Sequence, residues 1–160
     1  MHRKNLESLA GLARQYVGRS KYCLRASLDL APDIIDCSSF TQWLYAQIGL
    51  SIPRLSFQQF ESCRSLVLPS EAQIGQLMFR RSFYSRSNLC PLLVVGHVGL
   101  YVGNGNIVHA SFRSKTVVEE SIKNFFNVYE TGVVCAGSPT ENVVTETDST
   151  FSLVHKRNRN

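Results

Sequence analysis

The 160-residue sequence lacks an apolar run of the roughly 18–20 residues that a membrane-spanning helix needs. The longest candidate, Pro91 to Val102, is interrupted by His97. The first residues are basic, but they contain no continuous apolar segment and include Glu7, which is atypical of a secretory signal. We therefore expect no membrane span and, by default, a cytoplasmic location, with signal-independent secretion as an open alternative.

The chain also lacks the dense, even set of cysteines that marks a disulfide-stapled domain. It contains no CxxC or HxxxH pair, so a structural zinc site is not expected. The sequence predicts reduced thiols and neither a metal nor a cofactor. The five cysteines are odd in number and scattered, at Cys23, Cys37, Cys63, Cys90 and Cys135.

Charge is moderate and unevenly distributed. The composition, 44% hydrophobic and 18% charged, is typical of one globular domain, which we place at residues 1–137. Residues 138–160, rich in Thr, Ser, Asn and Glu, are predicted to be a mobile tail. The excess positive charge, a net +5, falls on the domain. It would attract nucleic acid, anionic lipid or an acidic peptide. Nucleic acid is the least expected of these partners, because no recognised binding motif accompanies the charge.

Helices are predicted in the first half of the chain and strands in the second. Three-and-four spacing of apolar residues, followed by glycine, indicates the helices, and β-branched runs between turn residues indicate the strands. The predicted elements of the first half are a helix over residues 4–17, a loop over 19–35, a helix from Cys37 to Gly49 and a short helix with Ser56 as its N-cap. Those of the second half are strands over Gln76–Arg80, Leu92–Val102, Asn106–Ser111, Thr116–Ser121 and Gly132–Ala136. This order predicts an α+β fold with N-terminal helices packed on a central antiparallel sheet.

Cys37 is the best candidate nucleophile in the sequence. It lies in the segment IDCSSF, at the predicted start of a buried helix. Unpaired backbone N–H groups and the helix dipole favour a thiolate at such a position. The alternative is a small buried residue with no chemical role.

Two histidines on neighbouring predicted strands complete a catalytic arrangement. His97, Gly99 and Tyr101 share one face of their strand, opposite an apolar face. A three-residue turn, Gly103-Asn104-Gly105, with Gly105 left-handed, would place His109 opposite Gly99 and diagonal to His97. A two-residue turn would put the histidines on opposite faces. The longer turn predicts that Cys37 attacks, His97 takes its proton and His109 orients His97.

These segments resemble those of a known family. IDCSSFTQWLYAQIGLSIPR resembles the nucleophile segment of the NlpC-type cell-wall peptidases, and GHVGLYVGNGNIVHAS resembles their histidine segment. The resemblance covers the chain from about Tyr16 to Glu120. It implies a papain-like fold and cleavage, through a thioester, of γ-D-glutamyl or diaminopimelate amide bonds in a peptidoglycan-type peptide. It also implies a catalytic triad of Cys37, His97 and His109 and substrate-side roles for Tyr22, Asp36 and Ser38.

The chain departs from the family pattern at three places. Ser39 stands where glycine is usual, Gln76 replaces a common aspartate, and residues 81–93 are longer and more basic than is typical. Two alternatives stay open: a thiol acyltransferase or amidase acting on a lipid or a protein side chain, and an inactive basic binding module. The sequence leaves the oligomeric state undetermined.

Overall fold

The computed structural model describes residues 3–81, 95–126, 135–139 and 142–143. Its main feature is an eight-stranded sheet with the order β2-β1-β8-β7-β6-β5-β9-β4, in which every neighbouring pair is antiparallel except β1 with β2. The strands are β1 (Lys21–Tyr22), β2 (Ile34–Ile35), β4 (Cys63–Val67), β5 (Leu77–Arg81), β6 (Val95–Gly103), β7 (Asn106–Ser111), β8 (Thr116–Ser121) and β9 (Cys135–Pro139). A separate pair joins β3 (Leu50–Ser51) to β10 (Asn142–Val143).

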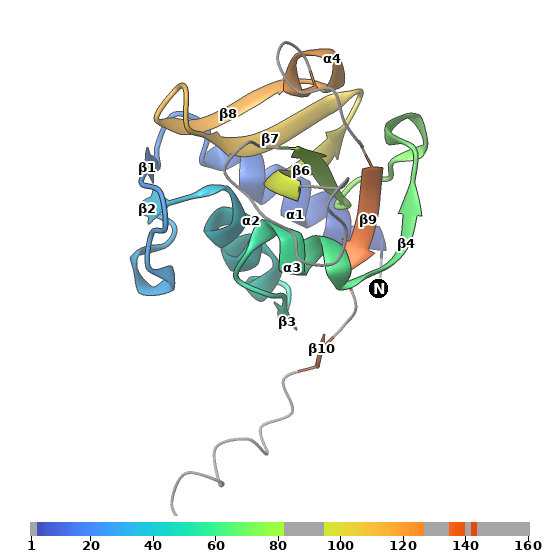
Figure 1. The fold of residues 1–160 in the computed structure, drawn as a ribbon, viewed down its shortest axis with the longest axis horizontal. Coiled ribbons are helices and arrows are strands. Elements are labelled where there is room, and N and C mark those ends of the chain that lie inside the picture. The colour runs from blue at the N-terminus through green and yellow to red at the C-terminus, as the bar shows by residue number, and fades with distance from the viewer. Residues whose placement is uncertain (1–2, 82–94, 127–134, 140–141, 144–160) are drawn as a thin grey trace, which may run out of the picture.

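Three helices pack on one face of this sheet (Figure 1). They are α1 (Arg3–Gln15), α2 (Cys37–Ala46) and α3 (Ser56–Glu61). The main core lies between α1, α2 and the apolar face of β6, where Phe40 and Leu44 of α2 and Leu100 of β6 are fully buried. The expected α+β fold with N-terminal helices on a largely antiparallel sheet is confirmed.

The opposite face of the sheet carries a smaller core under α4 (Ile122–Phe125). Phe125 packs there with Met78 and Ile107, and all three are completely buried. In Figure 1, α4 lies beyond β7 and β8, on the side away from the other helices. The histidine-bearing face of β6 is therefore covered and not simply exposed to solvent.

Several predicted boundaries need correction. The predicted loop over residues 19–35 contains β1, β2 and a 3-10 turn at Leu28–Leu30, because two-residue strands leave no periodic signal. Ser56 is the first residue of α3, and Leu55 occupies the N-cap position. β4 and α4 were not predicted. Residues 92–94 and 132–134, where two predicted strands begin, and most of the predicted tail lie outside the described residues.

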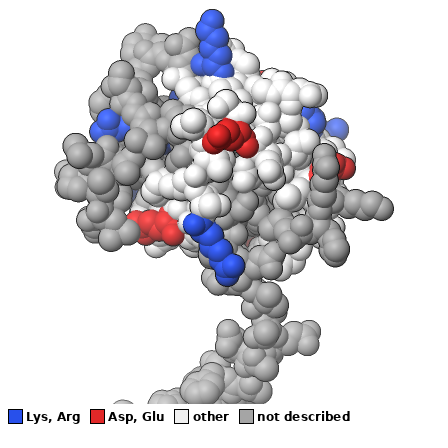
Figure 2. All heavy atoms as spheres, turned by 90° about the vertical axis from the view of Figure 1, so that its right-hand side faces the viewer, with Lys and Arg blue, Asp and Glu red and all other residues white. Residues whose placement is uncertain are grey.

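On the face that carries β4 and β9, the charged side chains of the described residues are of both signs and lie interspersed (Figure 2). Arg14 of α1 pairs with Glu119 of β8 across 3.1 Å.

No helix within the described ranges is both long and apolar enough to cross a bilayer.

The turn between β6 and β7 has two residues, Asn104 and Gly105, because Gly103 still pairs with Asn106, so the predicted three-residue turn is wrong. A register shift between Tyr101 and Gly103 supplies the extra residue instead, so the short turn does not send the histidines to opposite faces. Gly103, Asn104 and Gly105 all have positive φ, at 90°, 54° and 73°. Leu100 pairs with Val108 and Tyr101 with Ile107, a register that places His109 opposite Gly99. The predicted register is confirmed, and both histidines lie on the same face.

Gly99 permits the close approach of the two strands, which yields a prediction about stability. A methyl group at Gly99 would lie 2.6 Å from Ile107 Cγ2 and 3.0 Å from His109 Cβ. We expect Gly99→Ala to lower the free energy of unfolding by about 1–3 kcal/mol through overpacking, measured by urea denaturation.

Gly11→Ala is the matched control, because a methyl group at this helical position meets no atom within 4 Å. It should raise stability by about 0.5–1 kcal/mol through helix propensity. A neutral Gly99→Ala variant would contradict the packing described for the histidine face.

Candidate active site

The nucleophile candidate is held at the first turn of α2 by a capping box. Asp36 is the N-cap, its carboxylate accepts the backbone N–H of Ser39 at 2.8 Å, and Ser39 Oγ accepts the N–H of Asp36 at 2.8 Å. Cys37 is therefore the first helical residue, as predicted. The serine that replaces the usual glycine at position 39 is fully buried and closes the cap.

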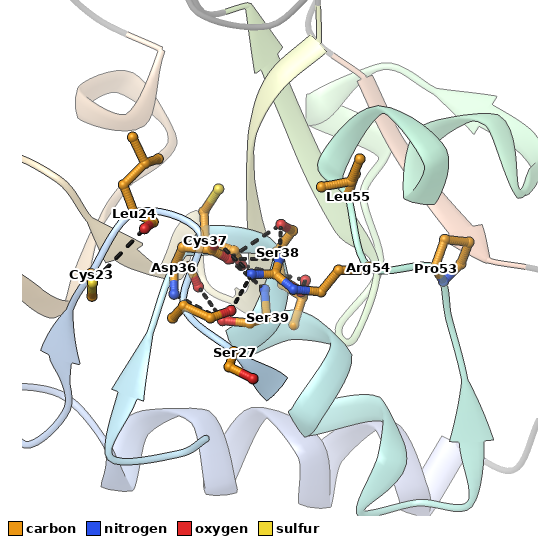
Figure 3. Close-up of polar contacts among 12 residues, drawn as sticks. Cys23, Leu24, Ser27, Asp36, Cys37, Ser38, Ser39, Pro53, Arg54 and Leu55 are labelled. Atoms are coloured by element: carbon orange, nitrogen blue, oxygen red, sulfur yellow. Dashed lines mark hydrogen bonds and ion pairs between the residues drawn. The ribbon is translucent and has the colours of Figure 1, made fainter. Parts of the chain in front are cut away.

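Arg54 ties the same turn to the chain after β3. Its guanidinium binds both carboxylate oxygens of Asp36, at 3.0 and 2.7 Å, and donates to Ser38 Oγ at 2.9 Å and to the carbonyl of Ala26 (Figure 3). This two-pronged contact is the geometry that arginine makes best with a carboxylate. Asp36 and Ser38, the predicted substrate-side residues, are thus held in one network beside Cys37.

The sulfur of Cys37 lies against β6 at the point where β6 separates from β7. The β6–β7 register begins only at Leu100 with Val108, and the backbone N–H of Val98 hydrogen-bonds the sulfur. The N–H of Ser38 does the same from the helix side. The thiol therefore sits between a helix start and the strand that carries His97.

Burial sets the charge state of this thiol. Cys37 is only 8% exposed, and burial, reinforced by the negative charge of Asp36, raises its pKa to about 11. The N–H groups of Val98 and Ser38 and the charge of Arg54 act in the opposite direction but are outweighed. The expectation that the helix start favours a resting thiolate is wrong for this reason.

The two histidines meet as the register requires. His97 Nε2 and His109 Nδ1 are 2.9 Å apart, with the rings nearly perpendicular at 89°. Phe125 packs on both rings, at centroid distances of 5.6 and 5.1 Å. Among the described residues, this contact leaves Nδ1 as the His97 nitrogen with no hydrogen-bond partner.

His97 is neutral at ordinary pH. Burial, the neighbouring His109 and the cation of Arg80 hold its pKa well below the usual 6.5. A neutral imidazole can act as a base toward a protonated thiol. Within the described residues no hydrogen bond joins Cys37 to His97. In catalytic pairs, the nucleophile and the base often come within hydrogen-bonding distance only when substrate is bound.

Tyr22 of β1 also belongs to this neighbourhood. It is 9% exposed, and burial together with the nearby charges of Cys37 and Asp36 raises the pKa of its phenol. The hydroxyl therefore stays protonated and can act as a donor. The described contacts place the sequence-predicted site residues in two groups: Tyr22, Asp36 and Ser38 around Cys37, and His97 with His109. Val98, the residue after His97, connects them through its backbone N–H at the Cys37 sulfur.

Sequence reasoning missed three residues of this region: Arg54, Glu120 and Phe125. Glu120 of β8 lies 2.6 Å from His109 Nε2. Strand pairing could have indicated Glu120, because it is diagonal to His109 on β8. Arg54 is the last residue of the quoted nucleophile segment, whereas no sequence signal indicated that Phe125 would cover the histidines. Within the described ranges no group of three or more His, Cys, Asp or Glu residues is arranged to hold a metal.

Comparison with known proteins agrees with this geometry. Over 79 residues, the chain is 42% identical to the probable endopeptidase p60 of Listeria seeligeri, which covers 49% of this chain and 13% of the relative. Over 86 residues, it is 37% identical to the murein DD-endopeptidase MepS/murein LD-carboxypeptidase of Escherichia coli, covering 52% of this chain and 40% of the relative. The chain thus spans less than half of either relative.

A solved structure shows the same fold. RipD of Mycobacterium tuberculosis, described as a non-catalytic NlpC/p60 domain protein adapted to peptidoglycan binding, superposes with a TM-score of 0.61 at 17% identity. The match covers 84% of this chain and 98% of that one. The NlpC/P60 family model itself matches residues 19–135, which include Cys37, His97, His109 and the network around them. The chain therefore belongs to the NlpC/P60 family.

Proposed function

We propose that this protein is a cysteine endopeptidase or amidase that hydrolyses a γ-D-glutamyl or diaminopimelate amide bond in a peptidoglycan-type peptide. The observation that carries the proposal is the contact of His97 with His109 next to Val98, whose backbone N–H reaches the Cys37 sulfur at the start of α2. It supports roles for Cys37 as nucleophile, His97 as base and His109 as the residue that orients His97. The names of the two relatives, an endopeptidase and a murein peptidase, support the reaction and the substrate class.

The chemistry follows from the resting protonation states. His97 Nδ1 accepts the proton of the Cys37 thiol as the sulfur attacks the amide carbonyl carbon. The backbone N–H of Cys37, at a helix position with no intrahelical acceptor, is available to stabilise the oxyanion. His97 then donates the proton to the leaving amine, and a thioester remains on Cys37. Water, deprotonated by His97, attacks the thioester and releases the acid and the free thiol.

The buried pair remains within reach of a substrate. Cys37 and His97 keep 8% and 7% of their surface exposed, so neither residue is completely sealed inside the core. The Asp36–Ser38–Arg54 network and Tyr22 lie near Cys37. They offer a peptide both charged and neutral hydrogen-bonding groups.

The central prediction concerns cleavage. Incubation with tri- and tetrapeptides built on L-Ala-γ-D-Glu-diaminopimelate should give fragments whose masses identify the bond, and Cys37→Ala should abolish them because the nucleophile is lost. An acid-quenched sample should show a thioester adduct on the native chain.

Cys23→Ala is the matched control, because this exposed cysteine lies next to Tyr22 but takes no part in the reaction; it should cleave normally. The RipD comparison makes the negative result informative. If no peptide is cut although iodoacetamide labels Cys37 selectively, the substrate assignment is wrong. If Cys37 also stays unlabelled above about pH 11, where its thiol is ionised, the protein is a binding module and not an enzyme.

The pH dependence of kcat/KM provides a separate prediction. The reactive form has a neutral His97 and a protonated Cys37. Because the pKa of His97 is lowered well below 6.5, this form persists as the pH falls through 6.5 and is lost only at lower pH. At the other end it persists until the pH approaches 11, where Cys37 ionises.

We therefore expect a broad plateau with its acid limb well below pH 6.5, measured from initial rates in buffers of constant ionic strength. An acid limb at or above pH 6.5 would show that His97 does not have the depressed pKa that its burial implies.

A further inference from the structure

Glu120 extends the histidine pair by one more residue. On β8, Ile107 pairs with Glu120 and His109 with Val118, so Glu120 lies diagonally across from His109 on the same face of the sheet. Its carboxylate contacts His109 Nε2 at 2.6 Å, and His109 Nδ1 contacts His97 Nε2 at 2.9 Å. Three side chains on three consecutive strands thus form one continuous hydrogen-bonded row.

The carboxylate determines which atoms in this row donate hydrogen bonds and which accept them. The hydrogen bond from His109 lowers the pKa of Glu120, so the group is ionised and can only accept. A neutral His109 therefore carries its proton on Nε2, which leaves a lone pair on Nδ1. That lone pair accepts the Nε2 proton of His97, and the lone pair of His97 is left on Nδ1, the nitrogen that remains free.

The same row also compensates the positive charge that His97 acquires. When His97 takes the proton of Cys37 it becomes a cation in a site that burial and Arg80 make unfavourable. The arginine charges that act on Glu120 are those of Arg80 on β5 and Arg113 in the β7–β8 turn. Glu120 is the acidic member of the row, and its side chain is 29% exposed while that of His109 is 2% exposed. It supplies a negative charge at the solvent side of two buried rings.

We propose that Glu120 is a positioning residue: it fixes both imidazoles as Nε2–H tautomers and compensates the charge that His97 acquires from Cys37. The catalytic consequence of this role rests on the proposed function, whereas the tautomers and the reactivity of the thiol do not. Substrate is therefore not needed to test it.

The first measurement is the alkylation rate of Cys37 by iodoacetamide between pH 6 and 12, followed by peptide mass spectrometry. Near neutral pH, alkylation depends on the thiolate formed when His97 takes the proton. Glu120→Ala should slow it by about 10- to 100-fold, the loss expected for one charge-assisted hydrogen bond. Glu120→Gln, which keeps an acceptor but no charge, should fall between Glu120→Ala and the native protein.

At high pH the alkylation rates of all variants should converge, which a general loosening of the fold would not produce. Above about pH 11, where Cys37 ionises without help, all variants should react alike. Glu119→Gln is the matched control: Glu119 is the preceding residue on β8 but pairs with Arg14 and Asn106 and not with a histidine. It should alkylate at the native rate.

The second measurement is ¹⁵N NMR of the imidazoles in the native protein, which reads the tautomers directly and needs no variant to fold. Both His97 and His109 should be protonated on Nε2 and bare on Nδ1, and Glu120→Ala should mix the tautomers of His109. Where substrate is cleaved, the Glu120 variants should lower kcat more than they raise KM.

The proposal is overturned if either histidine is protonated on Nδ1 in the native protein. It is also overturned if Glu120→Gln and Glu120→Ala keep native alkylation rates near neutral pH. Failure of the proposed function gives a different pattern, in which no peptide is cut while the tautomers and the alkylation rates behave as described.

Discussion

The candidate active site depends on the register between β6 and β7. A two-residue turn followed by a register shift between Tyr101 and Gly103 sets that register, and the absence of a side chain at Gly99 lets the strands approach closely enough for the imidazoles to touch. A shift of one residue would send every side chain of one strand to the opposite face. His109 would then lie in the main core and His97 would lose its neighbour, so the turn is as much a part of the chemistry as the residues it aligns.

The site also shows how burial and fixed dipoles compete. The helix start offers N–H groups to the Cys37 sulfur, yet desolvation and the charge of Asp36 dominate, and the thiol is neutral at rest. The same burial keeps His97 neutral. The ion pair needed for attack thus has to form during the reaction, and surrounding charges such as that of Arg54 on the thiol side influence how readily it forms.

Much of this arrangement was predictable from the sequence, because it rests on local signals. The alternation along His97–Tyr101 and the glycine-rich hairpin predicted the shared face of the histidines, although the extra residue lies in the β6–β7 ladder and not in the turn, and the apolar spacing after Cys37 placed it at a helix start. What could not be predicted depends on contacts between distant segments. Phe125 covers the histidines only because α4 folds over β7, and the pKa of Cys37 depends on how much of the sheet surrounds it. The two-residue strands β1 and β2 exist through pairing alone.

The neutral resting state of Cys37 bears on how the protein survives oxidants. Peroxides attack thiolates and not thiols, so the route from sulfenic to sulfonic acid starts only where a thiol is ionised. With its pKa near 11 and 8% of its surface exposed, Cys37 presents very little thiolate to a peroxide at neutral pH. Burial, together with the carboxylate of Asp36 that the capping box and Arg54 hold near the thiol, thereby makes Cys37 resistant to oxidative damage.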